Sequence, residues 1–269
     1  MKSISSIFTI VMFALLSVTT LSLPAIAQDT ITTINKDKLI VGMAGEQPPY
    51  NFSTIQGTVI GYDVDLATYL ATAMNRELEI TLMPFADLIP TLEAGKVDVV
   101  LSALAITQQR KEKVLFTTSY GLAGKTILTT KKNMKRIHQT TGFNNDDVKL
   151  VALKGSTSAE LAKNRLAKAQ LTTIDHYEDG VLAILSGEAD GMVADLSICE
   201  LIVYRDNTNE LAILKRPIGS EEIGIALPKG SESLQKEINQ HLITFASENG
   251  IEELHQKWFL DASWLPLVP

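Results

Sequence analysis

The sequence predicts an α/β protein with two mostly parallel sheets, each flanked by helices. Short apolar runs of strand length alternate with segments of helical periodicity through most of the chain. This alternation starts again at Val148, which indicates a second sheet with a core of its own. Because ligands of such sheets usually lie at the carboxyl ends of the strands, the loops that follow the strands are the first places to search for a site.

Three strands and the helices between them account for the first sheet. The strands cover residues 38–43, 78–83 and 97–101, and the two helices begin at Asp63 and Asp87. Asp63 and Asp65 lie in the first turn of their helix, where a carboxylate suits the positive end of the helix dipole. We therefore assign these two residues to capping rather than to catalysis.

Two glycines separate the first half of the chain from the second. Residues 114–120 and 125–130 are expected to be extended, and Gly121 and Gly124 lie between them. Since glycine adopts backbone conformations that other residues avoid, we expect a hinge or a crossover at this point.

The second sheet is predicted from a similar series of strands and helix starts. Its strands cover residues 148–153, 171–174 and 191–194, and residues 222–228 are again extended. Thr157-x-x-Glu160 has the pattern of a capping box, which predicts a helix start at Thr157. Another helix ends at Gly187, a further one begins at Asp195, and two helices with Trp258 and Trp264 end the chain.

Residues 1–27 have the pattern of a secretory signal peptide. Lys2 precedes an apolar core at residues 7–16, and Ala25-Ile26-Ala27 provides the small residues that precede a cleavage point. No cysteine lies near this point, so we expect a mature chain that is not anchored to lipid. An exported protein without an anchor suits a Gram-negative periplasm, and no later run is long and apolar enough to cross a membrane.

Charge and cysteine content exclude several kinds of partner. Loss of residues 1–27 removes Lys2 and no acidic residue, so the net charge changes from −7 to −8. This acidic balance argues against nucleic acid and anionic lipid as partners. The sole cysteine, Cys199, excludes an internal disulfide, and it is best explained as a small buried apolar residue.

The sequence gives no indication of a metal, a cofactor or a familiar catalytic motif. The four histidines are scattered, without the spacing of metal ligands, at His138, His176, His241 and His255. HExxH and GxSxG motifs are both absent. We therefore expect no metal site and no cofactor.

Fixed charges at strand ends indicate an anion site instead. The segment 98–110 is an apolar strand followed by Thr107-x-x-Arg110, a capped helix start that carries a guanidinium able to hold a carboxylate with two parallel hydrogen bonds. Thr157 and the N–H groups of its helix start can bind the same anion, and Asp195 can receive an ammonium. These groups together would complement a zwitterion. The alternatives are an Arg110 paired with a local acid, and a Thr157 and an Asp195 that only cap their helices.

Several short segments occur in one order across nearly the whole mature chain. They are Pro48-Pro49-Tyr50, Gly61-Tyr62-Asp63-Val64-Asp65-Leu66, Leu88-Ile89-Pro90-x-Leu92, Gly95-Lys96-Val97-Asp98, Ile106-Thr107-x-x-Arg110, Phe116-Thr117-x-Ser119-Tyr120, Gly155-Ser156-Thr157 and Gly187-x-x-Asp190. In this order and spacing the chain resembles the bacterial family 3 solute-binding proteins, the extracytoplasmic receptors of polar amino acid ABC importers.

The resemblance implies a periplasmic-binding-protein type II fold, in which two α/β lobes are joined by two crossover strands and close on the ligand. Lobe 1 would comprise residues 28–123 and 222–269, and lobe 2 residues 124–221. The implied partners are an amino acid or small carboxylate and an ABC permease in the inner membrane, and we expect the receptor to be a monomer.

The resemblance also assigns roles to individual residues. Arg110 would clamp the ligand carboxylate, Thr157 would add a donor from the other lobe, and Asp195 would receive the ammonium. The further residues expected at the site are Phe85, Gln47, Tyr50, Ser156, Ala103 and Ala105. Ala105 stands where the family usually has a serine or threonine, and Ala103 where it has a glycine or serine. Since a hydrogen bond to a charged group contributes ~1.5–3 kcal/mol, a weaker site or a different acid is expected.

Two other functions fit the same resemblance. The first is a cyclohexadienyl dehydratase-like enzyme, since residues 144–166 are similar to that branch of the fold. That branch has a catalytic acid three residues after the position of Asp195, and Ile198, which stands there, cannot transfer a proton. The second is a stand-alone receptor that docks on a signalling protein, which the sequence does not separate from transport.

Overall fold

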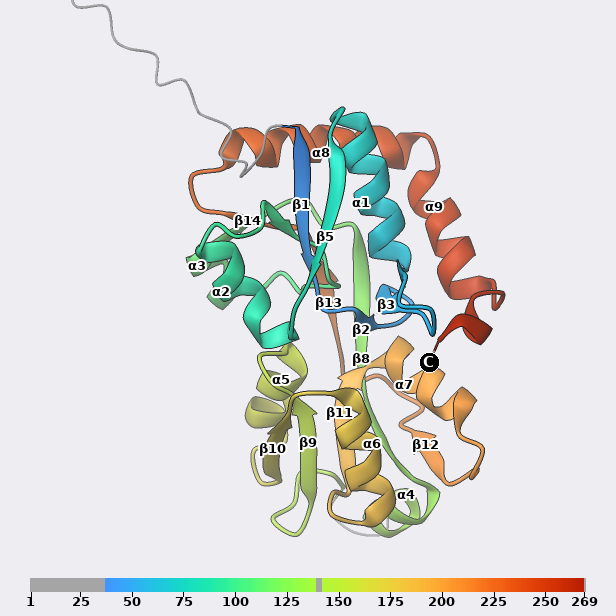
Figure 1. The fold of residues 1–269 in the computed structure, drawn as a ribbon. Helices are drawn as coiled ribbons and strands as arrows, with labels where there is room; N and C mark the ends of the chain where they lie inside the picture. The colour runs from blue at the N-terminus through green and yellow to red at the C-terminus, as the bar shows by residue number, and fades with distance from the viewer. Residues whose placement is uncertain (1–36, 139–141, 269) are drawn as a thin grey trace, which may run out of the picture.

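The computed structural model describes residues 37–138 and 142–268, which form two lobes, one above the other in Figure 1. The predicted signal peptide lies outside these residues. Each lobe contains an α/β sheet, so the predicted fold class is confirmed. In the part of the chain that is described, no helix combines the length and the apolar character needed to span a membrane.

The upper lobe is built on a five-stranded sheet with the strand order β5-β1-β6-β14-β7. The predicted parallel strands β1 (Lys38–Met43), β5 (Glu77–Leu82) and β6 (Val99–Val100) are confirmed. However, β14 (Ala226–Pro228) is antiparallel to both β6 and β7 (Val114–Phe116), which makes the sheet mixed. This strand enters from the other lobe without a crossover helix, so a parallel direction is not imposed on it.

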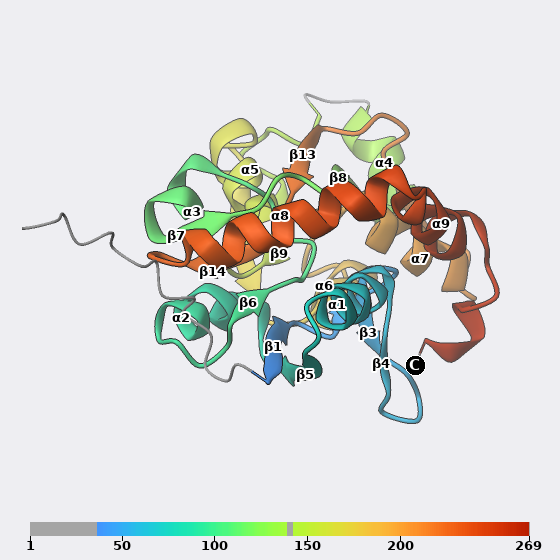
Figure 2. The same cartoon turned by 90° about the horizontal axis from the view of Figure 1, so that it is seen from above.

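The helices of the upper lobe cover both faces of its sheet and one end. They are α1 (Tyr62–Ala73), α2 (Leu88–Glu93), α3 (Gln108–Lys113), α8 (Glu232–Ser247) and α9 (Gly250–His255). Figure 2 shows α8 lying across the end of this lobe. The buried Leu66 and Leu70 of α1 and Leu234 and Ile238 of α8 belong to one core together with Leu39 and other residues of the sheet.

The lower lobe contains a six-stranded mixed sheet. Its main order is β10 (Gln170–Ile174), β9 (Lys149–Leu153), β11 (Gly191–Asp195), β8 (Gly121–Thr130) and β12 (Leu211–Ile213), and β13 (Gly219–Ile223) also pairs with β8. The three predicted strands β10, β9 and β11 are parallel to one another. Strand β8 runs antiparallel to β11, and β12 and β13 both pair with β8 in antiparallel fashion. The helices are α4 (Lys131–His138), α5 (Thr157–Arg165), α6 (Tyr177–Ser186) and α7 (Leu196–Arg205). Cys199 lies buried in this lobe, as predicted.

Two antiparallel strands connect the lobes. The first half of β8 pairs with β13 from Gly121 opposite Ile223 to Lys125 opposite Gly219, and then β8 continues into the lower sheet. The prediction that Gly121 and Gly124 lie outside the extended segments is therefore wrong, because both glycines belong to the continuous strand β8, which pairs with β13 here. A crossover at this point is confirmed. The division of the chain at residues 123 and 222 stays a prediction.

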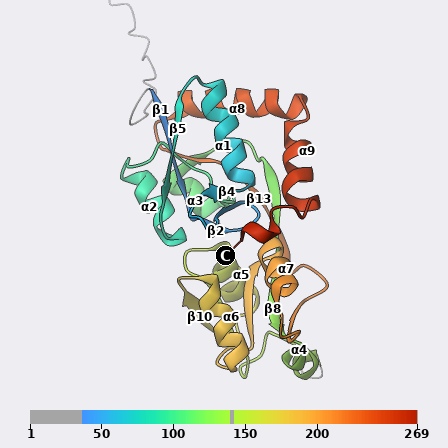
Figure 3. The ribbon, with the colours of Figure 1, turned by 45° about the vertical axis from the view of Figure 1, so that its right-hand side comes forward.

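The loop after β1 and the C-terminal segment lie where the lobes meet. The loop forms a small sheet of β2 (Glu46–Gln47), β3 (Asn51–Ser53) and β4 (Val59–Ile60). After α9 the chain makes a π-helical turn at Gln256–Leu260 and a 3-10 turn at Leu265–Leu267, and Figure 3 shows this segment beside α7 of the lower lobe. Trp258 is buried against Phe52 and Trp264.

Asp63 does not cap its helix, which corrects the assignment made from the sequence. The N-cap of α1 is Gly61, and no side chain caps it. Asp63 is fully buried, and its carboxylate accepts hydrogen bonds from the Tyr120 hydroxyl (2.9 Å), Asn51 Nδ2 (2.8 Å) and the Ala103 N–H (2.9 Å). It thus joins three separate segments. Asp65 is not the N-cap either, and it binds Lys257 and the Trp258 indole N–H.

We expect Asp63 to make the fold more stable in mild acid. Burial raises the pKa of Asp63 to about 6 despite its three hydrogen bonds, so the folded state holds the proton more tightly than the unfolded state. Lowering the pH from 7 to 5 should therefore add about 1 kcal/mol to the free energy of unfolding through this group. The Asp63→Asn variant should lack this increment in urea titrations at the two pH values. Asp65→Asn is the matched control, and an equal pH dependence in the wild type and Asp63→Asn would contradict the assignment.

Candidate functional site

The loop after β6 ends in the predicted capped helix start. Thr107 is the N-cap of α3, and its hydroxyl accepts a hydrogen bond from the Arg110 N–H at 3.2 Å. This cap is confirmed. Because Arg110 is the third residue of α3, its long side chain extends from the first turn of the helix towards the other lobe, and it is 7% exposed.

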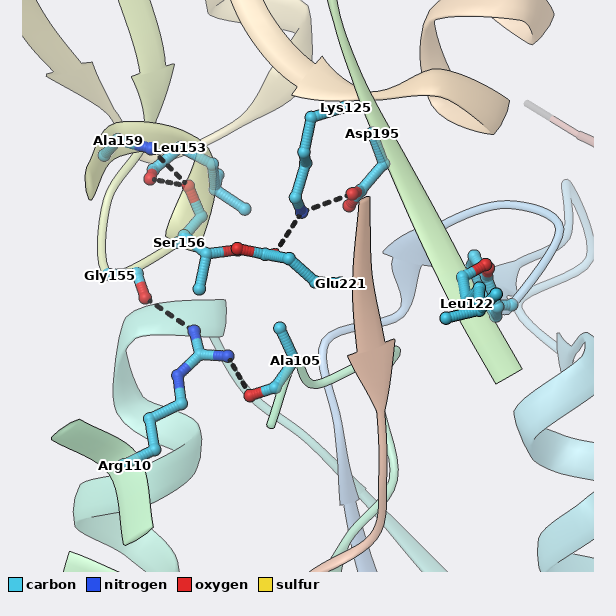
Figure 4. Close-up of polar contacts among 12 residues, drawn as sticks. Ala105, Arg110, Leu122, Lys125, Leu153, Gly155, Ser156, Ala159, Asp195 and Glu221 are labelled. Atoms are coloured by element: carbon cyan, nitrogen blue, oxygen red, sulfur yellow. Dashed lines mark hydrogen bonds and ion pairs between the residues drawn. The ribbon is translucent and has the colours of Figure 1, made fainter. Parts of the chain in front are cut away.

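The Arg110 guanidinium is held by groups from both lobes (Figure 4). Nη1 donates to the Ala105 carbonyl at 2.9 Å, and Nη2 donates to the Gly155 carbonyl of the lower lobe at 3.1 Å. The Phe85 ring centroid lies 5.8 Å from the guanidinium carbon, within range of a cation–π interaction. Within residues 37–138 and 142–268, no carboxylate oxygen lies within 4.0 Å of its nitrogens, which argues against pairing with a local acid.

This arrangement leaves a buried cation whose direct hydrogen bonds end on neutral carbonyls. Burial lowers the pKa of Arg110, and the more distant carboxylates of Glu160, Glu221 and Asp195 raise it. A guanidinium has five N–H donors, and the two carbonyls occupy two of them. Arg110 can therefore receive an anion in addition to its protein contacts.

Ala105 offers a backbone donor close to Arg110. It lies opposite Ile223 in an antiparallel bridge, and the flanking hydrogen bonds run from Ile106 N to Glu222 O (2.8 Å) and from Gly224 N to Leu104 O (3.0 Å). In such a pair the N–H and C=O of the central residue both point away from the partner strand. The Ala105 carbonyl reaches Arg110 in this way, and its N–H is directed to the same edge.

Ala103 supports the loop rather than offering a donor. Its N–H is already bound to the Asp63 carboxylate, and its φ of 45° is a conformation that alanine rarely adopts. The backbone N–H of Ala103 is therefore not free to bind a ligand, and its expected place at the site stays a prediction. The glycine that the family often has at this position would adopt this φ without strain.

Helix α5 begins at Thr157 as predicted, but its N-cap differs from the predicted one by one residue. Ser156, not Thr157, is the N-cap: its hydroxyl accepts from the Ala159 N–H (3.2 Å) and donates to the Leu153 carbonyl (2.7 Å). The hydroxyl of Ser156 is thus bound both to its own helix and to the end of β9. Thr157 is the first residue of α5, and its hydroxyl donates to the Glu221 carboxylate across to β13.

Asp195 is paired with Lys125, a residue that was not predicted for the site. It ends β11 at the N-cap position of α7 but makes no capping bond, and its carboxylate instead binds Lys125 Nζ. Lys125 also lies 3.4 Å from Glu221 Oε2, so one ammonium lies between two carboxylates (Figure 4). A lysine within the apolar sequence of β8 was a visible sign that a charged partner lies nearby. The identity of that partner depends on the register between β8 and β11.

Further contacts show that the two lobes touch around this site. Gln47 is buried, and its Oε1 accepts a hydrogen bond from the Ser102 hydroxyl at 3.0 Å. The Gln47 side chain also forms a hydrogen bond with Tyr177 on α6 of the lower lobe. Burial raises the pKa of Tyr177, and this hydrogen bond opposes the rise. Phe85 packs against apolar cores of both lobes. A Cβ atom added at Gly155 would lie 3.2 Å from the Cα atom of Ala86, so the main chains of the lobes approach closely here.

Tyr50 lies in the core of the upper lobe. Its ring makes edge contacts with Tyr62 and Phe259, and its hydroxyl donates to the Leu122 carbonyl at 3.5 Å. These contacts explain why a large aromatic residue follows the two prolines. They give Tyr50 a packing role, and the Asp195 carboxylate adds to the rise that burial causes in the pKa of Tyr50, so its expected place at the site stays a prediction.

Two lobes joined by a pair of strands, with charged groups gathered between them, define a solute-binding protein of the type II class. The family model for bacterial extracellular solute-binding proteins, family 3, matches residues 39–261, and the chain belongs to this family.

Similar proteins are known from several bacteria. The ABC transporter glutamine-binding protein GlnH of Bacillus subtilis is 27% identical over 236 residues, which are 86% of this chain and 85% of that protein. A putative ABC transporter binding component from Wolinella succinogenes, solved with lysine, is 30% identical with a TM-score of 0.78, covering 86% of this chain and 99% of the other. An ancestral amino acid-binding protein described as a precursor of cyclohexadienyl dehydratase is 31% identical with a TM-score of 0.75, covering 83% and 96%.

The close approach at Gly155 predicts that an alanine there will weaken closure. Gly155→Ala adds a methyl group against the Ala86 backbone and places alanine at φ 74°, whereas Gly187→Ala adds it at φ 82° with no atom within 4 Å. Both variants should lose stability through φ, about 1–2 kcal/mol each. Only Gly155→Ala should shift the population towards open molecules, as measured by the radius of gyration in small-angle scattering. An equal response of the two variants would contradict a specific role of this contact.

An ion pair on the rim predicts that closure depends on pH. His176 Nδ1 lies 2.9 Å from Glu46 Oε1 of the other lobe, and this hydrogen bond and charge raise the pKa of His176, with further contributions from Asp179 and Glu178. The stabilisation is present below the unperturbed pKa and is lost as the pH rises through the raised value. The closed fraction at pH 5.5 should exceed that at pH 8.5 in small-angle scattering. His176→Gln should reduce this difference, while His255→Gln, on α9, should leave it unchanged.

Proposed function

We propose that this protein is a receptor that captures an α-amino acid between its lobes and delivers it to an ABC importer. The observation that carries the proposal is the buried Arg110, which donates hydrogen bonds to carbonyls of both lobes and has no carboxylate within 4.0 Å among the described residues. A ligand carboxylate would supply the anion, and the Ala105 N–H would add a donor on the same side.

The charges around Arg110 suit a zwitterion. Arg110 contributes one positive charge, and the cluster of Lys125, Asp195 and Glu221 contributes one net negative charge. A ligand with a carboxylate and an ammonium would neutralise both ends. Because it would contact both lobes, such a ligand binds the closed form selectively, and this difference in affinity shifts the population towards closure.

The names of the relatives support an amino acid as the ligand. GlnH is named for glutamine, other relatives are named as cystine-binding and arginine-binding proteins, and the Wolinella structure contains lysine. These ligands share the α-carboxylate and α-ammonium and differ in their side chains. We therefore propose the shared group as the recognised feature and leave the side chain open.

We also propose that the protein is not an enzyme. The similarity to a precursor of cyclohexadienyl dehydratase raises that alternative. Ile198, at the position where that branch carries its acid, is 3% exposed and packs in the core of the lower lobe. An apolar side chain there cannot protonate a leaving group. Conversion of prephenate or arogenate on prolonged incubation with the protein would overturn this proposal.

The family and the signal-peptide pattern of residues 1–27 support a proposal for the cellular setting. We propose cleavage after Ala27, a periplasmic mature chain without a lipid anchor, a monomeric receptor, and an inner-membrane permease as its partner. Residues 28–123 with 222–269 and residues 124–221 are proposed as the two lobes that move relative to each other. A role as a stand-alone sensory receptor would use the same site with a different partner.

We predict that Arg110 is required for ligand binding. Arg110→Ala and Arg110→Lys should each weaken binding by about 100-fold or more, because neither residue can replace two charge-assisted hydrogen bonds to a carboxylate. A thermal-shift screen of the purified mature protein against the standard amino acids identifies the ligand, and calorimetry measures its affinity. Arg136→Ala, which removes an arginine that is paired with Asp190 on the lower lobe, should have no effect. If Arg110→Ala binds the same amino acid with unchanged affinity, the proposed site is wrong.

A further inference from the structure

We propose that the ligand ammonium is received by Glu221 on β13 rather than by Asp195, because Lys125 already occupies Asp195. This inference rests on the proposed function and names the carboxylate that binds the ligand ammonium. It departs from the role that the family resemblance assigns to Asp195.

The first step is the position of Lys125. Lys125 and Asp195 are cross-strand neighbours on β8 and β11, and their side chains are 5% and 8% exposed. Cross-strand partners of opposite charge interact directly, and a buried pair exchanges little with solvent. The ammonium of Lys125 thus takes the place at Asp195 that a ligand ammonium would require.

The second step is the accessibility of Glu221. Its side chain is 25% exposed, and its Oε2 atom receives Lys125 and the Thr157 hydroxyl. Its Oε1 atom makes no hydrogen bond or ion pair within residues 37–138 and 142–268. Asp195 also has one such oxygen, but its side chain is more deeply buried. Glu221 therefore presents the more accessible carboxylate oxygen of the cluster.

The third step is the position of Glu221 relative to the anion site. Ala105 lies opposite Ile223 on β13, and Glu221 is two residues from Ile223 and so on the same face of the strand. Two residues of a strand span about 7 Å. The charge of Glu221 also raises the pKa of Arg110 more than the charge of Asp195 does. A small zwitterion held by Arg110 and the Ala105 N–H lies closer to Glu221 than to the end of β11.

Charge decides between this arrangement and the main alternative. If Lys125 replaced the ligand ammonium, the ligand would be a carboxylate without an amine. Arg110, Lys125, Asp195 and Glu221 have no net charge together. A simple carboxylate would then leave one uncompensated negative charge in a largely buried site, which is costly, whereas a zwitterion adds none. The ligand class that follows is an α-amino acid with a free ammonium.

Two double variants with equal charge test the assignment. Lys125→Met with Asp195→Asn leaves Glu221 as the only acid of the cluster, and Lys125→Met with Glu221→Gln leaves only Asp195. Both leave a net charge of −1 on the cluster and remove both ion pairs of Lys125. With the amino acid found in the screen, we expect the first variant to bind within about threefold of the wild type and the second to bind at least tenfold more weakly, which is about 1.4 kcal/mol. Equal affinities, or the reverse order, would overturn the inference.

A test on the wild-type protein does not depend on how the variants fold. L-Glutamine and 4-carbamoylbutanoate differ only in the α-ammonium, as do L-lysine and 6-aminohexanoate. We expect only the amino acids to raise the melting temperature. If the deaminated compounds bind as tightly, the ammonium acceptor is wrong and the Arg110 site stands. If none of the amino acids and carboxylates tested binds, the proposed function fails, and this inference fails with it.

Discussion

The antiparallel pairing of β8 with β13 is the constraint on which the rest of the site depends. It joins the lobes, and its register places Lys125 near the end of β11 and Glu221 near the start of α5. The same β13 strand continues to the bridge that orients Ala105 towards Arg110. Polar groups from both lobes are thus attached to the two strands that connect the lobes, so binding of the proposed ligand and closure would share one set of contacts.

Arg110 explains why the lobes touch where they do. A buried guanidinium costs free energy unless its donors are satisfied, and one carbonyl from each lobe satisfies two of them. Phe85 adds a ring that packs on both cores. The two carbonyls are neutral, so these contacts leave the charge of the guanidinium uncompensated. A ligand carboxylate would provide the negative charge that neutralises Arg110. Closure that depends on a ligand requires such a difference between the bound and the free protein.

Local features of the site could be predicted from the sequence, and features set by register could not. The cap between Thr107 and Arg110 spans three residues, so its pattern is visible in the chain. The pair of Lys125 and Asp195 joins residues 70 positions apart, and a shift of β8 by one residue would turn Lys125 to the other face.

Asp63 and Ser156 show a subtler limit of sequence patterns. Acidic residues in the first turn usually stabilise their own helix, but the buried Asp63 carboxylate instead accepts hydrogen bonds from three other segments. Thr157-x-x-Glu160 fits the capping-box pattern, yet the observed N-cap is Ser156, which has Ala159 three residues later, and the Thr157 hydroxyl instead reaches Glu221. The two lobes were predictable because alternation of strands and helices is a property of long segments. At Ala105 the missing hydroxyl removes a side-chain donor, but pairing with β13 still orients the backbone N–H, so the donor that this position can offer a carboxylate comes from the main chain.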